Sequence, residues 1–123
     1  MAKKILVVDD KPYLVDLMAS RLKANGYEVV TATNGREGLE KAKEETPDLI
    51  LLDIAMPDMD GYRVLRHLKE FPGTQDIPVM ILTVKKWNQD IQKAIAAGAA
   101  DYIVKPFDPV KLLEKIGAAL QNA

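Results

Sequence analysis

Short apolar runs alternate along the whole chain with stretches in which apolar residues recur every three or four positions. The short runs are rich in Ile, Leu and Val and predict β-strands, at residues 5–8, 27–32, 49–52, 77–82 and 100–104. Each run is followed by a stretch with the helical period, so five strands should alternate with five helices. The runs at 5–8, 49–52 and 77–82 are apolar throughout, which is expected of parallel strands whose two faces are covered by helices. The pattern predicts a single α/β domain.

Residues that start or stop helices support these boundaries. Asn25 and Gly26 should end the first helix, and Gly98 should end the fourth. Asn34 should cap the second helix, which Pro47 should end. In the last helix, the stripe expected to face the core consists of Val110, Leu113, Ile116 and Leu120.

Polar residues stand where the predicted strands end. Asp9 and Asp10 follow the first strand, Asp53 follows the third, Thr83 the fourth and Lys105 the fifth. In an open parallel sheet these carboxyl ends lie at one edge, and ligands bind there where the strand order reverses. Three carboxylates from distant parts of the sequence should therefore meet.

Three neighbouring carboxylates repel one another, and a hard divalent cation relieves that repulsion. Oxygen ligands with water suit Mg²⁺. Lys105 adds a fixed positive charge, and the Thr83 hydroxyl can donate a hydrogen bond to an anionic oxygen. A carboxylate nucleophile, a metal, a cation and a hydrogen-bond donor are the parts that phosphoryl transfer to Asp53 needs.

Composition narrows the class of protein. The 123 residues are 48% hydrophobic and 28% charged, which suits a folded soluble domain. The chain has no cysteine, which excludes disulfides and thiolate chemistry. The net charge of −1 favours neither nucleic acid nor membrane. Without a signal-peptide pattern or an apolar run of about 20 residues, a cytoplasmic protein is expected.

Each site residue alone has an ordinary structural explanation. An Asp after a strand is usually a cap or turn residue. Lys105 before Pro106 would suit a solvated loop, and Thr83 alone carries no information. The combination is more specific, because five suitable residues fall at the same end of four strands.

Together these stretches resemble the receiver domain of bacterial response regulators, the phosphoacceptors of two-component systems. The resemblance covers nearly the whole chain and rests on residues 5–10, 53–61, 82–83 and 98–107. It implies a flavodoxin-like (βα)5 fold with a parallel five-stranded sheet of order 2-1-3-4-5 and helices on both faces.

The resemblance also implies roles for the strand-end residues. Asp53 would accept a phosphoryl group from the phosphohistidine of a histidine kinase or from a small donor. Asp9, Asp10, Asp53 and the backbone carbonyl of Ala55 would hold Mg²⁺, with Mn²⁺ as a substitute. The protein would be a regulatory phosphoacceptor, which assists only its own phosphorylation and dephosphorylation, rather than an enzyme.

The remaining roles concern the switch. Lys105 would pair with the acyl phosphate beside a cis bond to Pro106. Thr83 would move toward the phosphoryl oxygens, and Tyr102 would rotate into the space that Thr83 leaves. An ordinary half-buried strand position remains the alternative for Tyr102.

The expected output surface consists of the fourth helix, the fifth strand and the fifth helix, which Lys85, Lys86, Trp87 and Lys111 would decorate. Expected partners are a histidine kinase or phosphotransfer protein and a downstream protein. Direct contact with nucleic acid or membrane is not expected. The state would be a monomer or a phosphorylation-dependent dimer.

Several positions depart from the family pattern. Val84 stands where a small residue is usual, so it should narrow the approach to the phosphoryl site. Ala55 and Lys85 offer no carboxylate or carboxamide to position an attacking water. We therefore expect a long-lived phosphorylated form. Lys11 replaces a common acidic residue and should weaken cation affinity slightly.

Three other functions compete with the receiver interpretation. A haloacid dehalogenase-type aspartyl-phosphate phosphatase needs an Asp-x-Asp motif, whereas this chain has Asp9-Asp10-Lys11 and no room for a cap domain. A flavin-binding module needs a Gly- and hydroxyl-rich phosphate loop where the two Asp residues stand. A degenerate receiver would lack Asp53, Asp10 or Lys105, and all are present.

The organisation predicted from the sequence is one receiver domain over residues 1–123 with no output domain, because the sequence stops near the end of the last helix. Two alternatives stay open: a stand-alone receiver, or the receiver part of a longer transcriptional regulator.

Overall fold

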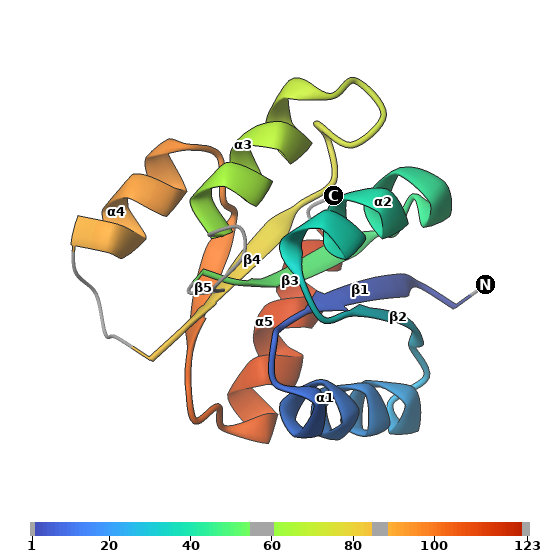
Figure 1. Cartoon of the computed structure of the whole chain (residues 1–123). Coiled ribbons are helices and arrows are strands. Elements are labelled where there is room, and N and C mark those ends of the chain that lie inside the picture. Colours follow the sequence, from blue (N-terminus) through green and yellow to red (C-terminus); the bar gives the residue numbers. More distant parts are fainter. Residues whose placement is uncertain (1, 55–60, 85–88, 122–123) are drawn as a thin grey trace.

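A parallel five-stranded sheet with helices on both faces carries the strand-end residues (Figure 1). The structure is a computed structural model that describes residues 2–54, 61–84 and 89–121. Its strands are β1 (Lys4–Val8), β2 (Glu28–Ala32), β3 (Leu49–Asp53), β4 (Val79–Thr83) and β5 (Asp101–Val104). Its helices are α1 (Pro12–Ala24), α2 (Gly35–Glu45), α3 (Gly61–Glu70), α4 (Gln89–Ala96) and α5 (Pro109–Gln121). All four pairings are parallel in the order β2-β1-β3-β4-β5, which confirms the predicted fold.

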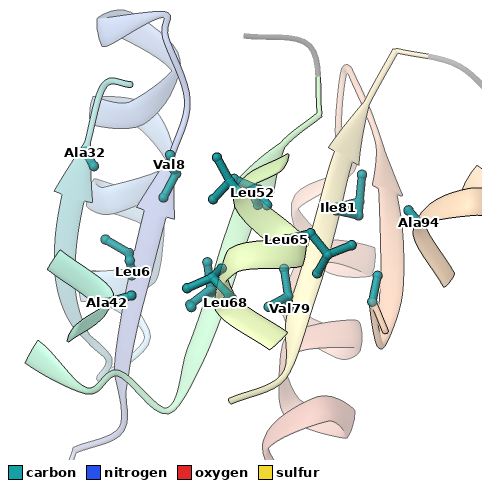
Figure 2. Packing of buried hydrophobic residues seen from close by; sticks show 13 residues of the cluster. Leu6, Val8, Ala32, Ala42, Leu52, Leu65, Leu68, Val79, Ile81 and Ala94 are labelled. Atoms are coloured by element: carbon teal, nitrogen blue, oxygen red, sulfur yellow. The ribbon is translucent and has the colours of Figure 1, made fainter. Parts of the chain in front are cut away.

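Alternate side chains of the inner strands point to opposite faces of the sheet and pack into two separate hydrophobic cores. On one face, Leu6, Ile50 and Ile81 pack with apolar residues of α2, α3 and α4. Figure 2 shows Leu65 and Leu68 of α3 among them. On the other face, the neighbouring positions of the same strands pack against Met18 and Leu22 of α1 and Leu112 and Ile116 of α5. The double coverage explains why the strands are apolar throughout.

Most predicted boundaries agree with the structure to within two residues. The Asn34 side chain caps α2 by accepting the Glu37 N–H at 2.8 Å, as predicted. That helix ends at Glu45, before Pro47, because Thr46 adopts the left-handed conformation with φ 41°. The predicted strand over residues 77–82 instead covers Val79–Thr83, so Thr83 is its last residue rather than the residue after it.

One predicted core position is wrong. Val110 is 63% exposed, whereas Leu112 and Ile116, which are four residues apart, are buried. Leu113 and Leu120 are partly buried against the same core. Val110 lies in the first turn of α5, where its N–H donates to the Asp108 carboxylate at 2.9 Å and its side chain is open to solvent. Within the described residues, none of the helices has the length and apolar character required to cross a bilayer.

Candidate functional site

Three carboxylates meet at the carboxyl ends of the central strand β3 and its neighbour β1. Asp9 and Asp10 follow β1, and Asp53 is the last residue of β3. Each offers an oxygen, and these oxygens all lie within 4.8 Å of one another. Asp9 is fully buried and Asp53 is 3% exposed. Such a group of buried acids needs positive charge nearby.

Backbone hydrogen bonds hold Asp9 in this arrangement. Its N–H donates to the Ala32 carbonyl of β2 at 3.1 Å, which extends the strand pairing beyond the end of β1. One carboxylate oxygen, Oδ1, accepts the Lys11 N–H at 3.0 Å. Helix α1 begins at Pro12, immediately afterwards, so its partly positive amino end lies beside the acids.

Asp53 is held by pairing with β4 and by the contact of the next residue, Ile54, with the start of α3. It stands opposite Leu82 in the register of the two strands. The next residue, Ile54, donates its N–H to the Leu82 carbonyl at 3.1 Å and accepts the Gly61 N–H at 3.0 Å. A side chain at Gly61 would place its Cβ 2.4 Å from the Ile54 Cα and 2.7 Å from the Asp53 carbonyl oxygen. Glycine is therefore required where α3 approaches the Asp53 backbone.

Lys105 supplies the positive charge. Its Nζ lies 2.6 Å from Asp9 Oδ2 and 3.5 Å from Asp53 Oδ2, and its side chain is only 11% exposed. Its backbone N–H donates to the Thr83 carbonyl at 2.6 Å, and its peptide bond to Pro106 is cis, as the family resemblance implied. The shorter contact is with Asp9, so the lysine mainly compensates the negative charge of that buried acid.

The charge of the cluster favours a further cation. Three carboxylates face one buried ammonium group, so two negative charges remain when all are ionised. Asp10 Oδ1 is buried and makes no hydrogen bond with any residue that the structure describes, although the Lys11 ammonium lies 3.8 Å away. An all-oxygen donor set with an unsatisfied buried oxygen fits Mg²⁺ or Mn²⁺.

The two predicted switch residues lie on neighbouring strands. Thr83 is 5% exposed at the end of β4 and stands opposite Val104 of β5. Tyr102 is half-buried in β5, opposite Ile81. Val84, immediately after Thr83, is 72% exposed.

Of the other positions predicted from the sequence, the structure describes Lys111 but not the four that lie outside the described ranges. Lys111 is exposed on α5, as an output-surface residue should be. Ala55, Lys85, Lys86 and Trp87 lie outside the described residues.

Two features of the site were not predicted from the sequence. The first is the close Asp9–Lys105 pair, because strand-end positions predict convergence but not which acid the lysine contacts. The second is the contact of Gly61 with the Asp53 backbone. In the sequence, Gly61 is only the last residue of the stretch 53–61, and its closeness to the site depends on where α3 begins.

Comparisons with known proteins agree with this geometry. The response regulator receiver domain family matches residues 5–117. The alkaline phosphatase synthesis transcriptional regulatory protein PhoP of Bacillus subtilis is 40% identical over 123 residues, which cover 100% of this chain and 50% of PhoP. The response regulator PleD of Caulobacter vibrioides is 42% identical over 116 residues, which cover 94% of this chain and 26% of PleD. The chain thus spans half or less of the length of these two relatives.

A solved structure shows the same fold. The chemotaxis response regulator CheY4 of Vibrio cholerae superposes with a TM-score of 0.92 at 33% identity, over 97% of this chain and 99% of that one. The family match, the relatives and the shared fold lead to one assignment: the chain belongs to the response regulator receiver family of two-component systems.

Proposed function

We propose that Asp53 accepts a phosphoryl group and that the resulting acyl phosphate switches the surface formed by α4, β5 and α5. The observation that carries the proposal is the convergence of Asp9, Asp10 and Asp53 around Lys105 in a buried cluster. Ordinary caps and turn residues would not bring three acids and a lysine from three strands to one place.

In the proposed transfer, one Asp53 carboxylate oxygen forms a bond to phosphorus. The bond from phosphorus to the donor breaks, and the donor leaves as the imidazole of a kinase histidine or as acetate from acetyl phosphate. Mg²⁺ held by Asp9, Asp10 and Asp53 would neutralise charge on the phosphoryl oxygens. The Lys105 ammonium, 3.5 Å from Asp53, would move from Asp9 toward the new phosphate, because the phosphoryl oxygens carry more negative charge than the carboxylate that they replace.

The switch follows from the new charge. Phosphorylation adds negative charge and several acceptor oxygens beside Thr83 and Lys105. The Thr83 hydroxyl would turn toward them, and Tyr102 would rotate into the space beside β4. Because Tyr102 lies on β5, its movement would change the surface shared with α4 and α5, where a downstream protein would bind.

The proposal extends to the biological setting. We expect phosphate to come from a histidine kinase or phosphotransfer protein, and the readout to be a protein contact made by a monomer or a phosphorylation-dependent dimer in the cytoplasm. Residues 1–123 would act as one receiver unit, whether alone or beside another domain. The protein would be a regulator that assists only its own phosphorylation and dephosphorylation.

The phosphate mimic beryllofluoride tests the proposal. With Mg²⁺ present, its addition should change the fluorescence of Trp87, the single tryptophan of the chain. The response should disappear when Mg²⁺ is removed with a chelator, and in Asp53→Asn. Equal behaviour of the wild type and Asp53→Asn would falsify the proposal, and Asp16→Asn on the exposed side of α1 controls for loss of one carboxylate elsewhere.

The lifetime of the phosphorylated state is a separate prediction. After phosphorylation with acetyl phosphate and removal of the donor, we expect decay over minutes or longer, because Val84 restricts the approach to the phosphoryl group and neither Ala55 nor Lys85 can position water. Val84→Ala should shorten the lifetime. Intact-mass spectrometry over time measures both. Decay of the wild type within seconds would contradict the expectation.

A further inference from the structure

Lys115 connects α5 to the open edge of the sheet through three contacts around Tyr102. Its Nζ donates a hydrogen bond to the Tyr102 carbonyl at 2.6 Å and lies 3.3 Å from Asp101 Oδ1. The same ammonium group lies 4.5 Å from the centre of the Tyr102 ring, within the range of a cation–π interaction. Three contacts from one side chain to two adjacent residues fix the position of this part of β5.

These contacts lie on the side of β5 that faces away from β4. Strand β5 is the last strand of the sheet, with β4 on one side only. Lys105 donates its N–H across to Thr83, and backbone groups alternate in direction along a strand, so those of Tyr102 face the open side. The Tyr102 N–H is taken up there by the Asp101 carboxylate at 2.8 Å. Asp101 and Lys115 together satisfy both backbone groups of Tyr102 at this edge.

The Tyr102 ring belongs to the opposite face of the sheet from α5. It packs against the core beneath α2, α3 and α4, whereas α5 covers the other face. Lys115 therefore reaches around the edge of β5 to contact the ring. Thr83 lies on the other side, in β4, so rotation of the ring toward Thr83 takes it away from the Lys115 ammonium. The hydrogen bond to the Tyr102 carbonyl does not require the ring and can persist.

We propose that Lys115 is a positioning residue for Tyr102. Its ammonium group holds the Tyr102 ring in the position that the ring has while Asp53 is unphosphorylated, and this contact is lost on activation. The inference rests on the proposed switch and adds a residue on α5 that sets its equilibrium. A contact made in only one of two states shifts the equilibrium toward that state. Removal of the ammonium should therefore favour the activated state before any phosphate is present.

The expected change in the switch equilibrium follows from the strength of cation–π contacts. A partly exposed cation–π interaction corresponds to an equilibrium change of about two- to fivefold. Lys115→Met retains most of the stem but loses the charge, so its apparent affinity for beryllofluoride with Mg²⁺ should rise by about two- to fivefold. Lys115→Arg keeps a cation over the ring and should restore wild-type affinity.

Matched controls separate this effect from a general loss of positive charge. Lys23 is exposed on α1, away from the switch surface, and its side chain makes no hydrogen bond or ion pair with another described residue. Lys23→Met should leave the affinity unchanged. In a Tyr102→Leu background, Lys115→Met should no longer raise the affinity, since the ring that it releases is absent. Equal effects of Lys115→Met and Lys23→Met, or an effect of Lys115→Met that persists without the ring, would overturn the proposal.

A second measurement does not depend on affinity. Nuclear Overhauser contacts between the Tyr102 ring and the Lys115 methylene groups should be present in the wild type without ligand and weaken in beryllofluoride. The role of Lys115 would be overturned if these Tyr102–Lys115 contacts were absent without beryllofluoride. It would also be overturned if they stayed unchanged in beryllofluoride while the fluorescence of Trp87 reported activation. If Trp87 and Asp53→Asn show no specific response, the proposed function fails, and the contacts in the unliganded protein still decide whether Lys115 holds the ring.

Discussion

Lys105→Met is expected to lower the free energy of unfolding of the metal-free protein by about 3–5 kcal/mol. Lys105 is the ammonium group beside two buried acids, at 2.6 Å from Asp9 and 3.5 Å from Asp53. Its loss would leave Asp9, which is fully buried, without that charge. A loss of this size is a large part of the roughly 5–15 kcal/mol that stabilises a typical domain. Urea unfolding in chelator measures it.

Two comparisons make the result specific to the buried pair. The double variant Lys105→Met with Asp9→Asn should recover much of the lost stability, because the acid is neutralised together with its partner. Lys115→Met removes a half-exposed pair with Asp101 together with the two contacts to Tyr102, and should cost only about 1–2 kcal/mol. If Lys105→Met were no more destabilising than Lys115→Met, the Asp9–Lys105 pair would not have the importance assigned to it.

Asp53→Asn should act in the opposite direction and stabilise the metal-free protein by about 1–3 kcal/mol. With an effective dielectric constant of about 20, unit charges 4.8 Å apart repel by about 3.5 kcal/mol. Asp53 meets two such neighbours, Asp9 and Asp10, and the attraction to Lys105 at 3.5 Å, about 4.7 kcal/mol, offsets only part of the repulsion. Neutralising Asp53 therefore relieves a net strain in the cluster.

In saturating Mg²⁺ the order of stability should be reversed, with the wild type more stable than Asp53→Asn. The wild type has the full set of carboxylates, so saturating Mg²⁺ should stabilise it more than Asp53→Asn. Urea unfolding of both proteins, in chelator and in excess Mg²⁺, gives four free energies from which the reversal is read. Asp16→Asn should change stability by no more than about 0.5 kcal/mol in either buffer. A wild type that is the more stable protein in chelator would contradict the electrostatic account of the site.

The fold was predictable because apolar runs and helical periods recur without interruption. The sheet order came from the family resemblance, and the pairing of β1 with both β2 and β3 agrees with it. Boundaries were less certain where local conformation decides them, as at Thr46, whose left-handed φ ends α2. The prediction that Val110 is buried was wrong. The apolar period shows that α5 has a buried face, but it does not fix the rotation of the helix about its axis closely enough to say which residues at the margin of that face are covered.

The convergence of the candidate site residues was predictable, but their individual contacts were not. Strand ends of a parallel sheet meet at one edge, which accounts for Asp9, Asp53 and Lys105. The preference of the lysine for Asp9, by 2.6 Å against 3.5 Å, depends on side-chain geometry that no spacing encodes. The position of Lys115 over the Tyr102 ring likewise depends on how α5 packs beside β5.

The position of the phosphoryl group decides whether Asp53 is the acceptor. The protein is incubated with acetyl phosphate and Mg²⁺, the acyl phosphate is reduced with borohydride, and the peptides are sequenced by mass spectrometry. Reduction converts a phosphorylated aspartate to homoserine, so we expect homoserine at position 53 and none at positions 9 and 10. No modification, or modification at Asp9 or Asp10 instead of Asp53, would contradict it.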